Sequence, residues 1–88
     1  MRYNFLIKEL GWTSILHFAV EDDEGKTIVE GGYGSPVKQE LYDFASLAIK
    51  LDYYPDAKIV SVANRDRFRT LTDDEMKGLE KAVKEKRW

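Results

Sequence analysis

The sequence predicts a single α+β domain over residues 1–88, with the element order βββαβ(β)α. Three patterns carry this prediction. Apolar and polar side chains alternate with a period of two through most of residues 2–30, which is typical of half-buried strands. Apolar residues from about 36 to 51 recur at steps of three and four, which indicates an amphipathic helix. Residues 72–75 spell Thr-Asp-Asp-Glu, a capping box that starts a second helix.

The alternation predicts three strands before the first helix. Residues 2–9 form the first strand and residues 13–21 the second, with a turn at Leu10-Gly11-Trp12 between them. The polar segment 22–26 ends in a Gly-Lys pair and predicts a hairpin turn into a third strand at 27–30. One face of the first two strands is apolar, formed by Tyr3, Phe5, Ile7, Leu16, Phe18 and Val20, whereas Ile15, His17 and Ala19 lie on the other.

The first helix is expected to follow the glycine-rich run 31–34. Ser35 fits the N-cap, and Pro36 fits the first helical position, where its missing N–H costs nothing. The glycines are expected to let the chain leave the sheet at this point. The helix over about 36–51 has an apolar stripe formed by Val37, Leu41, Phe44, Ala48 and Leu51.

The second half of the chain supplies the remaining strands and a second helix. Residues 58–63 are apolar and β-branched, which predicts a fourth strand, and 67–71 is a candidate for a short fifth one. We expect a mainly antiparallel sheet of four or five strands in the order 3-2-1-4, with strands one and four parallel. Both helices are expected to pack on one sheet face, and Gly78 predicts a close approach of the second helix to another element.

Composition excludes several classes of site. The 88 residues carry a net charge of −2 and contain one His and no Cys. A disulfide framework, a thiolate metal site, a cysteine nucleophile and a multi-histidine metal cluster are therefore excluded, and we predict no cofactor and no metal. The longest uncharged run, 10–20, is too short to span a membrane, so we predict a cytoplasmic protein without a membrane partner.

No constellation predicts catalysis, so we predict that the protein is not an enzyme. His17 lies mid-strand without a nucleophile motif, which favours a structural role, although a cleft holding His17 with two acids would revive an enzyme hypothesis. Asp22, Asp23 and Glu24 lack the alternate spacing of a calcium loop. The glycine run lacks the remaining residues of a phosphate-binding motif.

The most informative surface segment is Arg65-Asp66-Arg67-Phe68-Arg69. If it is extended, the three arginines share one face and form a local site for a carboxylate or phosphate. An exposed Phe68 could stack a base, whereas a buried Phe68 would leave the arginines to neutralise acidic groups of the domain itself.

Aromatic residues are a second surface signal. Tyr53 and Tyr54 are candidate binding residues in a connection, while Tyr33, Trp12 and Trp88 are each predicted either to close the core or to bind a partner. The charge is also uneven: residues 1–56 carry 5 Lys+Arg against 10 Asp+Glu, whereas 57–88 carry 9 against 6.

Taken together, these patterns favour a small non-enzymatic protein-interaction module. It would act as a regulator, inhibitor or accessory factor, of a kind common in phages and mobile elements. A protein partner is favoured over nucleic acid because the net charge is negative, and a homodimer through an edge strand is one form of this hypothesis. The alternative is a nucleic-acid-binding accessory domain that uses Arg65, Arg67 and Arg69.

Overall fold

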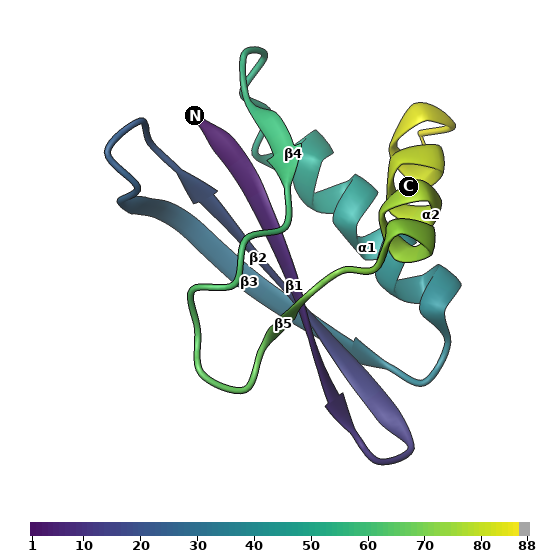
Figure 1. Cartoon of the computed structure of the whole chain (residues 1–88). Helices are drawn as coiled ribbons and strands as arrows, with labels where there is room; N and C mark the ends of the chain where they lie inside the picture. The colour runs from purple at the N-terminus through teal and green to yellow at the C-terminus, as the bar shows by residue number, and fades with distance from the viewer. Residues whose placement is uncertain (87–88) are drawn as a thin grey trace.

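The sheet is built around its first strand, as the computed structural model of residues 1–86 shows (Figure 1). Within these residues the order βββαββα is confirmed, with five strands and two helices. The elements are β1 (Arg2–Leu10), β2 (Thr13–Glu21), β3 (Thr27–Ser35), α1 (Lys38–Leu51), β4 (Lys58–Val60), β5 (Arg69–Thr70) and α2 (Asp73–Lys84).

The strand order is β3-β2-β1-β4, as predicted. β1 pairs antiparallel with β2 and parallel with β4, and β3 pairs antiparallel with β2. β5 adds antiparallel to β1 at Leu6 and Ile7, beyond the three residues that β4 covers. The short strands β4 and β5 therefore share one edge of β1, while β3 forms the opposite edge of the sheet.

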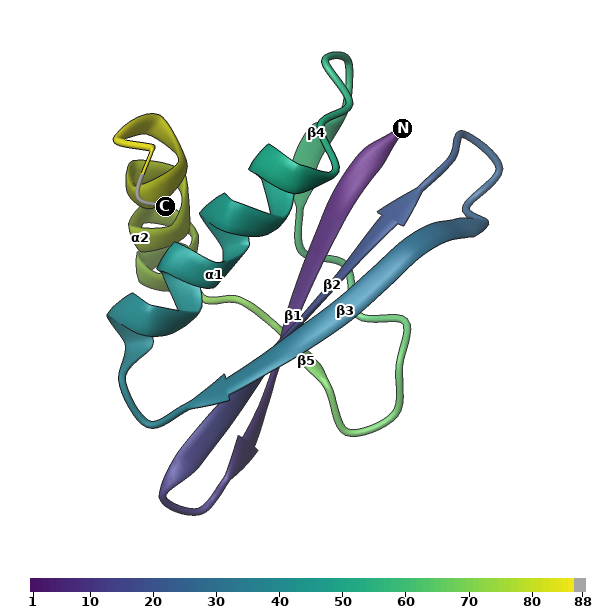
Figure 2. The same ribbon diagram turned by 180° about the vertical axis from the view of Figure 1, so that it is seen from behind.

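The apolar face predicted from the alternation lies against the helices. Both helices lie on this side of the sheet, and α2 packs chiefly against α1 (Figure 2). Burial of apolar area on this side supplies the main stabilisation of the fold. The core combines the predicted strand residues with Leu41, Ala45, Ala48, Leu71 and Leu79. Val37 and Leu51, predicted on the helix stripe, are instead exposed.

The predicted start of α1 was wrong by two residues, because the glycine run continues the strand. β3 extends through Ser35, and Val37, not Ser35, is the N-cap of α1. Ser35 still serves the turn, since its hydroxyl accepts the Val37 N–H and donates to Glu40. Gly31 lies under the ring of Phe18, where an added Cβ would sit 2.8 Å from the ring. Gly31 thus leaves the space on β3 that the ring of Phe18 occupies.

Two other strands are shorter than predicted. The segment 58–63 is a strand only at Lys58–Val60, and 67–71 only at Arg69–Thr70. The chain between them, 61–68, leaves the edge of β1 and passes across the sheet face opposite the helices (Figures 1 and 2). Its backbone is fixed there by Asn4, whose side-chain amide exchanges two hydrogen bonds with the backbone of Val62.

The predicted capping box and the predicted close approach of α2 are both confirmed. Thr72 accepts the Glu75 N–H, and Glu75 accepts the Thr72 N–H. Gly78 faces Tyr42 of α1, and a Cβ at position 78 would lie 2.5 Å from Tyr42 Cε2. The absence of a side chain at Gly78 therefore sets the distance between the two helices.

We expect Gly78→Ala to lower the free energy of unfolding by about 1–3 kcal/mol, because overpacking at Tyr42 outweighs the gain in helix propensity. In a Tyr42→Ala background the same substitution should raise stability by up to about 1 kcal/mol, since only the propensity term remains. Urea unfolding of the four proteins measures both effects. A stabilising Gly78→Ala in the wild-type background would contradict this account of the helix contact.

Candidate functional site

The predicted arginine segment is not extended, so its three arginines do not share one face. Arg67 is fully outside any strand and has a φ of +67°, which places it in the left-handed region. Arg65 contacts His17 Nε2 at 2.9 Å and the Glu30 carboxylate at 3.4 Å. Arg69 turns the other way, toward Glu75 and Glu9.

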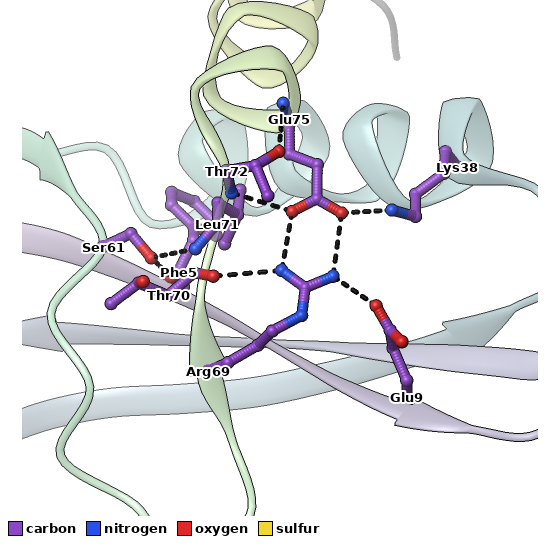
Figure 3. Close-up of polar contacts among 9 residues, drawn as sticks. All are labelled: Phe5, Glu9, Lys38, Ser61, Arg69, Thr70, Leu71, Thr72 and Glu75. Carbon is purple, nitrogen blue, oxygen red and sulfur yellow. Dashed lines mark hydrogen bonds and ion pairs between the residues drawn. The ribbon is translucent and has the colours of Figure 1, made fainter.

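Arg69 belongs to a polar network centred on the carboxylate of Glu75 (Figure 3). Two guanidinium N–H groups of Arg69 donate to Glu75, at 2.8 and 3.2 Å, and one also donates to Glu9. Lys38 and the backbone N–H of Thr72 also donate hydrogen bonds to the Glu75 carboxylate. Because these residues come from β1, β5, α1 and α2, the network joins four elements.

The network explains two shifts in ionisation. The Arg69 guanidinium is the main cause that lowers the pKa of Glu75 to about 2; burial opposes this shift, and Lys38 and the Thr72 N–H reinforce it. The hydrogen bonds to Glu75 and Glu9 raise the pKa of Arg69 in turn. Arg69 therefore has a structural role, and a ligand at Arg69 would compete with two carboxylates already bound.

The two tyrosines predicted as binding residues, Tyr53 and Tyr54, also differ in their surroundings. Tyr53 is 67% exposed, whereas Tyr54 is half-buried against Tyr3, with ring centroids 6.4 Å apart. The Tyr3 hydroxyl accepts the Tyr54 N–H and donates to the Asp52 carbonyl. The turn that carries both tyrosines precedes β4, whereas the loop that carries Arg65 and Arg67 lies across the sheet face opposite the helices (Figure 1). The assignment of a ligand to these residues stays a prediction.

A small polar cavity lies on the sheet face opposite the helices. It has a volume of about 140 Å³, and its lining includes His17, Glu21, Glu30, Asn64 and Arg65. It therefore holds the histidine and two acids that would revive an enzyme hypothesis. The size is well below the roughly 300 Å³ at which ligand pockets begin.

Most polar groups of this cavity bind one another, but His17 Nδ1 is buried without a hydrogen-bond partner among the described residues. Burial, followed by the positive charge of Arg65, lowers the pKa of His17. The guanidinium of Arg65 lies at hydrogen-bond distance from His17 Nε2, so the lone pair of that nitrogen is used. Glu21 is fully buried and accepts from Arg2, Asn4 and Asn64. Because its accepting nitrogen is already used by Arg65, this arrangement favours a structural role for His17.

Phe68 is neither fully exposed nor fully buried, the two alternatives that the sequence left open. It is half-buried and packs on His17, with ring centroids 5.6 Å apart. Lys8 and Arg65 each lie 5.8 Å from the centre of its ring. Phe68 thus anchors the 61–68 segment to the sheet and does not stand free for base stacking.

The acidic turn at 22–26 is held by its own backbone. Asp22 Oδ1 accepts the N–H groups of Glu24 and Lys26, as in an Asx turn, and Asp23 binds the N-terminal amine. The amine also lowers the pKa of Asp23. Over residues 1–86, no group of three or more His, Asp or Glu side chains is arranged to hold a metal ion.

Large apolar side chains are exposed at the β1–β2 turn and on β3, as they are at Leu51 and Tyr53. Trp12, predicted in that turn, is 81% exposed next to Gly11, whose φ is +61°. Ile28 and Tyr33 project from β3 and are 48% and 42% exposed. Trp88, for which we predicted either packing or binding, lies outside the described residues.

A groove lies between β3 and α1. It has a volume of about 290 Å³ and is lined by Tyr33, Glu40, Asp43, Phe44 and Leu47. Tyr33 stacks on Phe44, with ring centroids 5.2 Å apart and planes 18° apart. Sequence analysis missed this groove because it depends on β3 continuing through the glycine run; the signal available was Tyr33 between two glycines.

Comparison with known proteins adds no family to this description. No protein-family model, curated protein sequence or solved structure matches the chain. Neither helix in the described part of the chain is both long and apolar enough to cross a membrane.

The network at Glu75 makes stability depend on pH. Because its pKa is about 2 in the folded protein and about 4.5 in the unfolded chain, its stabilisation is complete above pH 4.5 and is lost as the pH falls toward 2. We expect the free energy of unfolding to decrease across this window by on the order of 2–3 kcal/mol, and the thermal midpoint to fall with it. Glu75→Gln should be less stable at pH 7 and should lose less stability between pH 4.5 and 2.

Thermal unfolding by circular dichroism at a series of pH values measures this dependence. Glu80→Gln, at an exposed position of the same helix, is the matched control and should keep the wild-type slope. Equal slopes for wild type and Glu75→Gln would contradict a dominant role for this carboxylate.

Proposed function

We propose that the protein is a small non-enzymatic protein-interaction module that binds an extended segment of a partner by strand addition to β3. One observation carries the proposal: β3 is a nine-residue edge strand that no described element covers. Outside its pairing with β2, no described residue makes a backbone hydrogen bond to β3. Such an edge is a template on which another strand can pair.

β3 lacks most devices that block edge pairing. Natural edge strands carry lysine, proline or a bulge that prevents a second strand from docking. Thr27–Ser35 contains no Lys and no Pro, and its one charged residue, Glu30, lies within ion-pair distance of Arg65. The irregularity in the ladder falls next to Val20 and Glu21, so the strand is regular from Val29 onward.

The groove beside β3 supplies the specificity that a backbone ladder lacks. Side chains of an added strand alternate between the two sheet faces, and those on the helix side would enter the groove at Tyr33 and Phe44. In this mode main-chain hydrogen bonds provide affinity, while the pocket selects the side chain.

The nucleic-acid alternative has less support. It rests on Arg65, Arg67 and Arg69, but Arg65 and Arg69 are bound to carboxylates of the same chain. Of the three arginines, Arg67 is therefore the one that this alternative would depend on most. Weak, salt-sensitive binding of mixed-sequence DNA or RNA that Arg67→Glu abolishes would favour this alternative.

The proposal is tested by selecting a random twelve-residue peptide display library on the protein. We expect extended peptides that protect alternate amides of β3 from hydrogen exchange when they bind. Ile28→Lys/Tyr33→Lys should weaken these peptides at least about tenfold, because lysines on an edge strand oppose pairing. Leu51→Lys/Val62→Lys makes the same change at exposed apolar positions elsewhere and should bind as wild type does.

Peptides that bind both double variants equally, or that leave the β3 amides unprotected, would overturn the proposal. Thermal midpoints of both variants verify that each is folded, and the exchange experiment on wild type does not depend on any variant.

A further inference from the structure

We infer that His17 is a proton-sensitive latch: while its ring is neutral it holds residues 65–68 on the sheet, and protonation of the ring releases them. The latch lies on the sheet face opposite the helices, so it goes beyond the proposed function and needs no added strand on β3. Three observations carry it. The contacts of residues 65–68 converge on one ring, one nitrogen of this ring must accept a hydrogen bond, and the surroundings of the ring disfavour a second proton.

Residues 65–68 form a short loop between two fixed points. Before the loop, the Asn64 amide donates to the buried Glu21 carboxylate at 2.8 Å, and after it Arg69 belongs to β5. Within the loop Arg67 has a φ of +67°, a region that residues other than glycine seldom adopt. The loop therefore depends on its side-chain contacts to keep this conformation.

The contacts that hold this loop on the sheet converge on the ring of His17. A guanidinium N–H of Arg65 donates to His17 Nε2 at 2.9 Å, and the ring of Phe68 packs on the imidazole, with centroids 5.6 Å apart. Arg65 also lies 3.4 Å from the Glu30 carboxylate, but both side chains are exposed, so this ion pair contributes little. The His17 ring is therefore the main attachment of the loop.

The contact with Arg65 fixes the protonation state of the imidazole. A guanidinium has donors and no acceptor, so Nε2 must present its lone pair, and the single proton of the neutral ring lies on Nδ1. Nδ1 is buried and has no hydrogen-bond partner among the described residues. A second proton would occupy the lone pair of Nε2 and set two donors against each other, which breaks the hydrogen bond to Arg65.

The surroundings of the ring oppose this second proton. Burial is the main cause that lowers the pKa of His17, and the positive charge of Arg65 adds to it. The carboxylates of Glu30 and Glu21 act in the opposite direction and are outweighed. Lys8 is a further cation, 5.8 Å from the centre of the aromatic ring that packs on the imidazole. The charged groups around the His17 and Phe68 rings are thus Lys8 of β1, Glu21 of β2, Glu30 of β3 and Arg65 of the loop.

This shift sets the sign of the pH dependence. When the loop is open, the ring is in water and takes up a proton near its ordinary pKa of about 6.5, whereas in the closed state it does so only at a lower pH. The loop is therefore closed above pH 6.5 and opens as the pH falls below this value. Between the two pKa values, the ratio of open to closed loop rises by up to about tenfold for each pH unit. The network at Glu75 begins to weaken only below pH 4.5, so the two effects can be separated.

The test is an NMR titration of the whole protein from about pH 7.5 to about pH 5. His17 is the one histidine of the chain, so the chemical shift of its Cε1–H reports its pKa directly. We expect a pKa below 6.5 and a fall in the backbone order parameters of residues 65–68 that follows protonation of the ring. The order parameter of Val62 should stay constant, because its N–H is held by Asn4.

Three variants attribute the effect to His17 and Arg65. His17→Gln keeps an acceptor for Arg65 but takes up no proton, so its loop should stay ordered across the whole range. Arg65→Gln removes the neighbouring cation and should raise the pKa of His17. Arg67→Gln removes the same charge from the same loop at a residue with no described contact to the imidazole, and it should leave this pKa unchanged.

A loop that loses order with falling pH in His17→Gln, or that stays ordered while the wild-type ring takes up its proton, would overturn the latch. A pKa of His17 at or above 6.5 in the wild type would do the same. Thermal midpoints at neutral pH verify that the variants are folded, and the wild-type titration is decisive if one of them is not. Peptide binding at β3 is measured separately, so the latch and the proposed function can fail independently.

Discussion

The buried carboxylate of Glu75 is the constraint on which the rest of the molecule depends. A charge removed from water is costly unless it is paired and hydrogen-bonded, and Glu75 meets both conditions through Arg69, Lys38 and the N–H of Thr72. The same carboxylate closes the capping box of α2 and fixes the two-residue strand β5, which is too short to hold itself by its ladder. The commitment of Arg69 to this network removes it from the anion site that the arginine spacing suggested.

The 61–68 segment completes the other half of the fold. Asn4 and Glu21 are fully buried on the face opposite the helices, where Val62 and Asn64 supply their hydrogen-bond partners. Ser61 adds a further tie, since its hydroxyl donates to the Phe5 carbonyl and accepts the Leu71 N–H. With helices on one face, this segment on the other and β4 and β5 along one edge, β3 is the part of the sheet that stays open.

Local patterns predicted the long elements, and contacts between distant residues decided the others. Period-two alternation located β1 and β2, and the Thr72–Glu75 capping box located the start of α2, because these signals lie within a few adjacent residues. The C-terminal part of β3 was missed because glycines carry no side chain and so show no alternation. The lengths of β4 and β5 depend on the residues of β1 whose backbone groups pair with them, and these lie far away in the sequence. The sequence alone left the arginine segment open between an anion site and neutralisation of acidic groups of the domain, because Glu9, Glu30 and Glu75 approach it only in the fold.

The open edge and the stabilising network lie on opposite sides of the sheet, and this separation matters for function. A strand added at β3 would extend the ladder beyond β2, while Arg69 lies on β5, which pairs with β1 on the other side of β2. Pairing at the outer edge of β3 would therefore leave the β1–β5 ladder and the Arg69–Glu75 pair in place. Gly31 leaves space for the ring of Phe18, so the glycine run serves close packing against the core while β3 remains a regular edge strand. An exposed edge that retains Ile28 and Tyr33 is an aggregation hazard for a free domain, which favours an edge that is covered when the protein acts.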